Sequence, residues 1–514
     1  MLAWTIYISF LGAAALMLRP KASARASRLV ALIASIASLA IVIIGTCRFT
    51  PGTLLTVVRV PWIPSLGIEY HLAADGISLI LLLLTGIVAV AGVLFLWNIE
   101  KRPAEFFALY LTLIGAVYGV FLSFDLFLFF VFYELAIIPK YFLISIWGST
   151  RREYAAMKLA LYSFAGSAMV LIGIIAAYIE AGAKTMNMVE LARFPFPPHF
   201  EMWVFPLVFI GFAILAGMWP LHTWAPTGHV AAPTAASMLL AGVIMKLGAY
   251  GCLRVAMMLF PLGMDHWSFH VLGLSSWRTV FALLGLIGIV YGATVALVQK
   301  DFKFVIGYSS VSHMGFVILG LMTLTQIGLS GAVIQMFSHA MISGLLFAVV
   351  GRMVYDRTHT RFLNELAPMH LARVIPFAAF TFVIASMASI GMPGFSGFIA
   401  EFEIIIGTWH AWPILAVLAA VGILIGIAFT WRAMDKAFFG GSALAESGDA
   451  APLAILPVDQ HPVLPPITAP ERIAAAILIA STVIVGIYPR ILLDLILPAL
   501  NSPLFDGLRK GAWR

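Results

Sequence analysis

The sequence predicts an all-α polytopic membrane protein of about fourteen transmembrane helices, with two inverted five-helix repeats and two broken helices. Hydrophobic residues make up 62% of the 514 residues, charged residues only 10%, and the mean hydropathy is +1.03. Apolar runs long enough to cross a bilayer as helices follow one another along the whole chain. Two of these runs are broken at corresponding positions, which indicates an internal repeat. The composition excludes a soluble enzyme.

The predicted spans, in chain order, cover residues 2–18, 28–46, 75–97, 104–122, 124–147, 155–179, 203–223, 233–259, 277–299, 303–323, 329–354, 375–407, 412–438 and 472–497. Lysine and arginine gather in the odd-numbered connections between the spans, which the positive-inside rule places in the cytoplasm. Both termini are then expected on the outer side. The pI near 9.4 reflects this bias and does not indicate nucleic-acid binding, because the basic residues are scattered through short loops.

The repeat divides the chain into four parts. Residues 104–259 and 277–440 form the two five-helix units, preceded by a three-helix segment, residues 1–103. Residues 441–514 follow as a cytoplasmic loop and a C-terminal helix. The fourth helix of each unit is interrupted, at residues 217–220 and 391–394. Because each unit has an odd number of helices, the second enters the membrane with opposite polarity, so the repeat is inverted.

The stretch 203–250 is the predicted centre of the protein. It holds the first interruption, a short polar turn with His222 and His229, and then an apolar helix whose single charge is Lys246. A helix broken inside a membrane exposes backbone groups that must be buried in protein or line a wet cavity, and transporters place their sites at such breaks. A lysine at this depth costs roughly 2.5–3.5 kcal/mol and usually faces the bundle interior with a function.

Four titratable residues lie at a common depth near the middle of their spans: Glu134, Lys246, His313 and His339. Each can hold or pass a proton when burial and neighbouring charge act on it, so together they predict a proton relay at the midplane. Glu401 follows the second break toward the outer side and is expected to be the exit group. For each residue taken alone, the alternative is a structural glutamate neutralised in the core, or a core histidine with satisfied hydrogen bonds.

Three further residues are secondary candidates for the proton path. Lys140 is six residues from Glu134, which is about 9 Å along a helix and on another face unless Pro139 bends the helix. The alternative for Lys140 is that its ammonium snorkels to the cytoplasmic surface. His222 and His229 flank the polar turn and are expected to admit protons from the cytoplasm, with capping of the next helix as the equal alternative.

Nothing in the sequence indicates a catalytic centre within this chain. Cys47 and Cys252 lie far apart and support neither a disulfide nor a metal framework. There is no glycine-rich nucleotide fingerprint after a strand, no cysteine spacing for an iron–sulfur cluster and no nucleophile constellation. We therefore expect no cofactor and no metal in this chain.

Several motifs in these regions resemble one known family. They are FYELAIIPKYFLISIWG, RREYAAMKLALYSF, PLHTW with AGVIMKLGAYG, KDFKFVIGYSSVSHMGF, FSHAMISGLLF, VYDRTHTR, GMPGFSGFIAEF and the late GIYP. The chain resembles the antiporter-like, proton-translocating membrane subunits of complex I, the NADH:quinone oxidoreductase. Within that family it is similar to the M-type subunit, because Glu401 stands where the sibling subunits tend to carry lysine. The matching motifs are distributed over most of the chain.

The resemblance implies a role for each residue of the predicted relay. The family proton path maps onto Glu134 as the helix-five carboxylate, Lys246 as the connecting lysine, His313 and His339 as the central relay and Glu401 as the exit carboxylate. It also implies that NAD, FMN, iron–sulfur clusters and quinone bind in partner subunits. Those partners would be the other membrane-arm subunits of a complex I-type assembly in a bacterial inner membrane. This chain would then serve a translocase reaction of the respiratory chain without a redox centre of its own.

The sequence departs from the family pattern at two places. The family has a lysine just before the first break, as KVP or KLP, paired with the helix-five glutamate, whereas this chain has Leu215 in LAG. The family also reads LPDAH where residues 225–229 read APTGH. Three hypotheses follow: a pump in which Lys140 or Lys246 stands in for the missing lysine, a paralogue in a complex I-related hydrogenase or Mrp-type cation/proton antiporter, or a membrane scaffold that no longer pumps.

Overall fold

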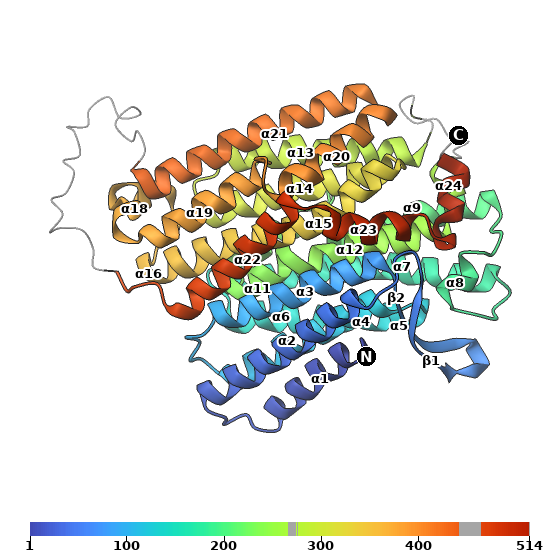
Figure 1. The fold of residues 1–514 in the computed structure, drawn as a ribbon, viewed down its shortest axis with the longest axis horizontal. Coiled ribbons are helices and arrows are strands. Elements are labelled where there is room, and N and C mark those ends of the chain that lie inside the picture. The colour runs from blue at the N-terminus through green and yellow to red at the C-terminus, as the bar shows by residue number, and fades with distance from the viewer. Residues whose placement is uncertain (266–273, 275, 441–463, 513–514) are drawn as a thin grey trace.

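The computed structural model describes residues 1–265, 274, 276–440 and 464–512. Long helices run side by side along one direction and form an elongated bundle, with a small β-hairpin at one end (Figure 1). The two strands of this hairpin, β1 (Leu55–Ile63) and β2 (Ile68–Ala74), are antiparallel. Most of the predicted cytoplasmic loop, residues 441–463, lies outside the described residues.

The helices of the first half are α1 (Trp4–Met17), α2 (Ala24–Cys47), α3 (Gly76–Phe95), α4 (Pro103–Leu122), α5 (Leu126–Leu135), α6 (Ile137–Trp147), α7 (Arg152–Glu180), α8 (Met188–Leu191), α9 (Pro198–Ala216), α10 (Trp224–Ala231), α11 (Thr234–Leu239) and α12 (Met245–Gly251). Those of the second half are α13 (Trp277–Val298), α14 (Phe302–Met322), α15 (Gln326–Phe347), α16 (Asp356–Thr358), α17 (Leu363–Leu366), α18 (Leu371–Val374), α19 (Pro376–Ser389), α20 (Ser396–Ala411), α21 (Pro413–Met434), α22 (Ala469–Ile487), α23 (Arg490–Leu500) and α24 (Asp506–Ala512). The π-helical segments are η2 (Leu240–Ile244), η3 (Cys252–Met257), η5 (Ala348–Tyr355) and η7 (Asp435–Phe439). The 3₁₀ turns are η1 (Pro64–Leu66), η4 (Leu262–Met264), η6 (Ala367–Met369) and η9 (Pro503–Phe505).

The number of membrane spans is compatible with the prediction. Twelve helices of the described residues are long and apolar enough to cross a membrane, some of them built from consecutive segments such as Thr234–Met257. The apolar helices α1 and α19 are shorter, with 14 residues each, and with them the count reaches fourteen. The last predicted span, residues 472–497, is wrong in its extent. It divides into α22 and α23, because Pro489 cannot donate a helical hydrogen bond and Tyr488 before it leaves the helical conformation.

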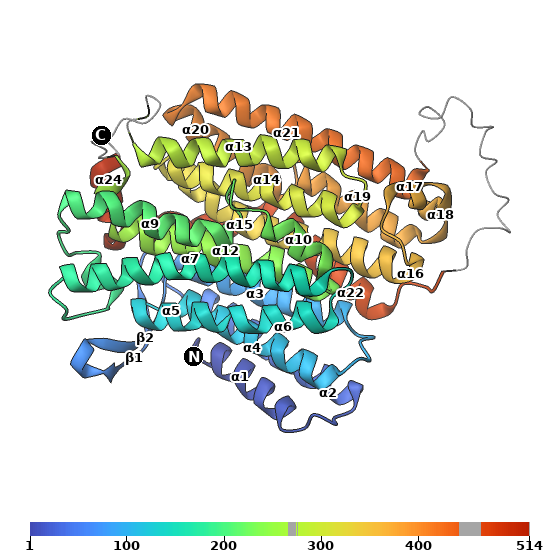
Figure 2. The same cartoon turned by 180° about the vertical axis from the view of Figure 1, so that it is seen from behind.

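The two ends of the bundle differ in what they carry. Both chain termini and the hairpin lie toward one end, and α16 and α18 lie at the other, as the two opposite views show (Figures 1 and 2). Because successive spans alternate in direction, the odd-numbered connections reach the end that holds α16 and α18. The basic residues of these connections therefore share one end, as a positive-inside pattern predicts. Which side of the membrane this end faces stays a prediction.

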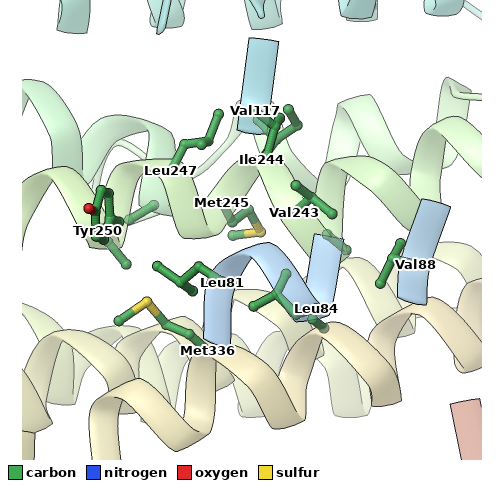
Figure 3. Packing of buried hydrophobic residues seen from close by; sticks show 14 of the residues in the cluster. Leu81, Leu84, Val88, Val117, Val243, Ile244, Met245, Leu247, Tyr250 and Met336 are labelled. Atoms are coloured by element: carbon green, nitrogen blue, oxygen red, sulfur yellow. The ribbon is translucent and has the colours of Figure 1, made fainter. Parts of the chain in front are cut away.

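The interior of the bundle is an apolar core formed by α3, α4, η2, α12 and α15 (Figure 3). Leu81 and Leu84 of α3 lie close to Met245 of α12 and Met336 of α15 (Figure 3). The span Thr234–Met257 is buried along its whole length, and α15 is buried over nearly all of its length. Polar groups on these two inner helices are therefore shielded from lipid.

Both predicted helix breaks are present. α9 stops at Gly217, which takes a left-handed conformation with φ of 83°, and the chain re-enters a helix at Trp224. The indole of Trp224 donates to the carbonyl of Ile214 at 2.8 Å, which also accepts from the amide of Gly217 at 3.1 Å, so the side chain reinforces the end of α9. The second break separates α19 from α20, with Gly391 and Gly394 at φ of 69° and 97°. The paired breaks are compatible with the predicted inverted repeat.

A buried ion pair ties the start of α3 to the end of the span Thr234–Met257. The carboxylate of Asp75 caps α3 by accepting from the amide of Ser78 at 2.9 Å, and it pairs with Arg254 of η3 at 2.5 Å. The guanidinium of Arg254 is fully buried and also donates to the hydroxyl of Tyr250 at 3.2 Å. Both charges thus find their partners within the protein.

We predict that Arg254→Met destabilises the protein by about 3–5 kcal/mol, because it leaves the carboxylate of Asp75 buried without a counter-charge. Replacing both partners, as Asp75→Asn with Arg254→Met, should cost less. The midpoint of thermal unfolding and the yield of the assembled membrane complex measure the effect. Equal destabilisation by the single and the double variant would show that the uncompensated charge is not the cause.

Candidate functional site

Lys246 lies at the centre of the bundle, in the first turn of α12 and directly after the π-helical segment η2. Its side chain is 0% exposed. The ammonium contacts Nδ1 of His339 at 2.6 Å and donates to the carbonyl of Ala241. π-helical turns shift the hydrogen-bond register of the backbone and are frequent at functional sites. The buried lysine and the helix irregularity therefore coincide.

His339 of α15 connects Lys246 to the next titratable group. Because an ammonium can only donate, Nδ1 of His339 accepts from Lys246 and Nε2 then carries the hydrogen. Nε2 is buried and meets no hydrogen-bond partner among the described residues. The ring centroids of His339 and His313 lie 5.4 Å apart. A ring rotation or one bridging water would complete a hydrogen bond between the two histidines.

His313 of α14 lies beside the second helix break. Its Nδ1 is 2.9 Å from the carbonyl oxygen of Ser309, and its Nε2 is 3.1 Å from that of Ser389, the last residue of α19. Both contacts are hydrogen bonds at the same time only if the ring carries two N–H groups, as an imidazolium does. Nε2 is also 3.6 Å from Oε1 of Glu401. The carbonyl at the broken end of α19 therefore helps to hold a histidine N–H next to a carboxyl group.

Glu401 of α20 ends this series of contacts. Its side chain is buried, and its carboxyl group lies beside the amide of Gln335 on α15. A small cavity between α14, α20 and α21 borders the carboxyl group, with His313, Ser389 and Phe429 in its lining. We call the series Lys246, His339, His313 and Glu401 the buried polar line. It crosses four helices, α12, α14, α15 and α20.

Glu134 does not join the buried polar line. It lies near the end of α5, beside Ser167 of α7 and within electrostatic reach of Lys140. Its Oε1 is buried and has no hydrogen-bond partner among the described residues. Phe129, Tyr133, Phe212 and Tyr250 form an aromatic cluster between α5, α9 and α12, with ring centroids 5.4–6.3 Å apart. The expected single axis is thus divided into two groups of residues.

Lys140 is buried, so the snorkelling alternative is wrong. Its side chain is 1% exposed and its ammonium donates to the hydroxyl of Ser163 on α7 at 3.1 Å. The helix is interrupted here, since α5 ends at Leu135 and α6 begins at Ile137. Pro139 has no N–H for the carbonyl of Leu135, which explains the interruption.

His222 and His229 are both buried, and their ring nitrogens have no hydrogen-bond partner among the described residues. The ring of His222 packs against two tyrosine rings, at centroid distances of 5.3 and 6.2 Å. His229 lies within electrostatic reach of Lys246 and of Lys303 near the end of the bundle. The capping alternative is wrong, because no side chain caps α11.

Sequence analysis missed the uncharged groups around these residues. Gln335 lies one turn before His339 on the same face of α15, and Ser163 and Ser167 lie one turn apart on α7, so helical spacing could have pointed to them. The carbonyls of Ala241 and Ser389 carried no signal, because helix irregularities decide which carbonyls are free.

The described residues hold no group of three or more His, Cys, Asp or Glu side chains arranged to bind a metal ion. Cys47 is exposed, Cys252 is buried, and neither forms a disulfide. The expectation that this chain binds no cofactor stays a prediction.

Known proteins match the chain over most of its length. It is 35% identical to NADH-quinone oxidoreductase subunit M of Rhodobacter capsulatus over 495 residues, which cover 93% of this chain and 90% of the relative. It is 37% identical to NAD(P)H-quinone oxidoreductase chain 4 2 of Microcystis aeruginosa over 402 residues, 77% of this chain and 70% of the relative.

Solved structures and a family model agree with these relatives. A chain in the structure of respiratory complex I from Thermus thermophilus with bound NADH matches with a TM-score of 0.85 and 25% identity, over 100% of both chains. A chain of the Mrp complex from Dietzia sp. has the same fold, with a TM-score of 0.82, 21% identity and coverage of 100% and 99%. The family model described as NADH:quinone oxidoreductase/Mrp antiporter, transmembrane, matches residues 123–426. This chain therefore belongs to the NADH:quinone oxidoreductase/Mrp antiporter transmembrane family.

Proposed function

We propose that this chain is the M-type membrane-arm subunit of a complex I NADH:quinone oxidoreductase and moves protons across the membrane while other subunits transfer electrons. The observation that carries the proposal is the buried polar line from Lys246 through His339 and His313 to Glu401. Each of these groups can hold and pass a proton. Titratable groups inside a hydrocarbon layer cost stability, and proton transfer gives a reason for keeping several of them next to one another.

The relatives favour a subunit of complex I over a subunit of another assembly of the same family. The Rhodobacter capsulatus relative is named as subunit M of NADH-quinone oxidoreductase and is matched over nearly its whole length. The Mrp complex shares the fold at lower identity, so a subunit of an Mrp-type antiporter or of a complex I-related hydrogenase is the second candidate. A glutamate at position 401 resembles the M-type pattern and favours the first candidate.

In the proposed relay, the Nε2–H of His313 first passes its proton to the carboxylate of Glu401, 3.6 Å away, which releases it on the outer side. Lys246 then gives a proton to Nδ1 of His339, and the proton on Nε2 of His339 leaves toward the neutral ring of His313. Each transfer breaks one N–H bond and forms one N–H or O–H bond, so a proton moves and no electron does. Moving one charge against a membrane potential takes about 2.3 kcal/mol per 100 mV, and partner subunits must supply this energy.

The proposal assigns the redox chemistry to those partners. NAD, FMN, the iron–sulfur clusters and quinone bind in other subunits, and this chain supplies no redox centre. The protein lies in a bacterial inner membrane with both termini on the outer side. Its exposed apolar residues, such as Ile33 on α2 and Leu424 on α21, contact lipid or neighbouring membrane-arm subunits.

Leu215 is the observation that favours a scaffold that does not pump. It is buried in the apolar core, so α9 presents no cation at the position where the family carries lysine. The buried polar line, however, extends from Lys246 to Glu401 without any residue at that position. We therefore favour the pump over the scaffold.

We predict that Lys246→Ala in the assembled complex lowers the rate of proton pumping in proteoliposomes by about tenfold or more, because a positioned proton-transfer group commonly contributes about 100-fold. The substitution removes the ammonium that contacts His339 at 2.6 Å. The electron-transfer rate, recorded in parallel, shows whether the complex is intact. An unchanged number of protons per electron would support the scaffold function instead.

Glu401→Gln should also lower the number of protons moved per electron, because the amide cannot take up and release a proton at the end of the line. Glu403→Gln is a matched control on the same helix. Glu403 accepts from the hydroxyl of Ser330 at 2.6 Å and lies outside the buried polar line, so its variant should pump like the wild type. Equal losses in the two variants would contradict the exit role of Glu401.

A further inference from the structure

Lys140 is a buried cation that the buried polar line does not use. Its ammonium donates to the hydroxyl of Ser163, and this is its hydrogen bond within the described residues. A lysine in the hydrocarbon region costs roughly 2.5–3.5 kcal/mol on insertion scales. Glu134 is the carboxylate within electrostatic reach of this ammonium. A nearby counter-charge lowers a cost of this size, and the carboxylate of Glu134 is in a position to provide it.

Glu134 and Lys140 share α7 as a neighbour, although they are six residues apart. On a continuous helix, residues six apart lie about 9 Å apart along the axis and about 240° apart around it, and they do not meet. Here the regular helix stops at Leu135 and resumes at Ile137. Both Glu134 and Lys140 then approach α7, at Ser167 and Ser163 respectively.

Ser163 and Ser167 provide a polar link on α7. They are four residues apart, so they lie on the same face of the helix, one turn apart. The hydroxyl of Ser167 donates to the carbonyl of Ser163 at 2.9 Å. The hydroxyl of Ser163 accepts from Lys140, and that of Ser167 lies beside the carboxyl group of Glu134. The two serines therefore place the ammonium and the carboxyl group along one polar face of α7, one helical turn apart.

Lys246 is not the partner of Glu134 in this structure. Its ammonium contacts His339 and the carbonyl of Ala241. The aromatic cluster, which includes Tyr133 next to Glu134, fills the space between α5 and α12. Of the two lysines that could replace a cation at position 215, the contacts point to Lys140.

We infer that Lys140 is the cationic partner of Glu134 on the polar face of α7 formed by Ser163 and Ser167, and that one proton passes between the two groups. In one state an ammonium faces a carboxylate. In the other, an N–H bond of Lys140 has broken, an O–H bond of Glu134 has formed, and both groups are neutral. Inside a protein these two states lie close in free energy, because the desolvation of two charges offsets their attraction. A modest change in nearby charge then selects one state, which makes the pair a switch that feeds the pump.

The inference rests on the proposed proton translocation, and its test uses the assembled complex in proteoliposomes with pumping and electron transfer measured together. Lys140→Met removes the charge and should lower the protons moved per electron at least about twofold. Lys140→Arg keeps the charge and should recover most of the pumping. Lys158→Met is the matched control, because Lys158 lies on α7 and its ammonium reaches Thr227 at 3.5 Å. It should pump like the wild type.

A double variant tests whether the two residues act as one unit. If they exchange the same proton, Glu134→Gln combined with Lys140→Met should pump no worse than the more impaired single variant. Losses that multiply in the double variant would overturn the inference. Wild-type pumping by Lys140→Met, or no recovery in Lys140→Arg, would overturn it as well.

Ser163→Ala keeps both charges and provides a second test if Lys140→Met fails to assemble. It should lower pumping less than Lys140→Met does, and wild-type pumping in this variant would contradict the role of Ser163 in holding the ammonium of Lys140. Lys246→Ala distinguishes a wrong role for Lys140 from a wrong proposed function. If it lowers pumping while Lys140→Met does not, only the role of Lys140 is wrong. If neither variant lowers pumping, the proposed function itself is wrong.

Discussion

A charge inside a hydrocarbon layer is stable only where the protein supplies its partner, and this constraint shapes the middle of the bundle. Lys246 meets His339, Arg254 pairs with Asp75, and Lys140 reaches a serine of α7. These residues belong to spans that pack against other helices, whereas outer helices such as α2 and α21 present apolar side chains to the surroundings. The outer helices thus lie between lipid and the inner ones, and the residues of the buried polar line lie on helices that pack against other helices.

Irregular backbone accompanies the titratable groups of the site. Lys246 follows a π-helical segment, His313 contacts the carbonyl of Ser389 at the end of a broken helix, and Lys140 follows an interruption next to a proline. A regular transmembrane helix satisfies its own backbone and has little to offer a side chain. Where the helix is irregular, a carbonyl becomes available and fixes the orientation of a proton-carrying group, while that group satisfies the carbonyl.

Much of the fold could be predicted from the sequence, because hydrophobic length and loop charge are local properties. The predicted span 75–97 contains the whole of Gly76–Phe95, and both breaks were visible as glycine and proline in apolar runs. Lys246, His339, His313 and Glu401 stood out for the same reason, as single titratable residues in such runs. The separation of Glu134 from them could not be predicted, since it depends on how helices distant in sequence rotate and pack. The burial of Lys140 against Ser163 depends on the same packing.

The aromatic cluster between α5 and α12 has an electrical consequence. Phe129, Tyr133, Phe212 and Tyr250 lie between the two groups of titratable residues, and the hydroxyl of Tyr250 contacts Arg254 and Ser78. A standing column of water at this place would let protons run back down the membrane potential and discharge it. Close-packed rings leave no room for such a column. If the chain pumps protons as proposed, this layer closes a leak path between the two groups of residues, and apolar packing then protects the membrane potential that proton transfer builds up.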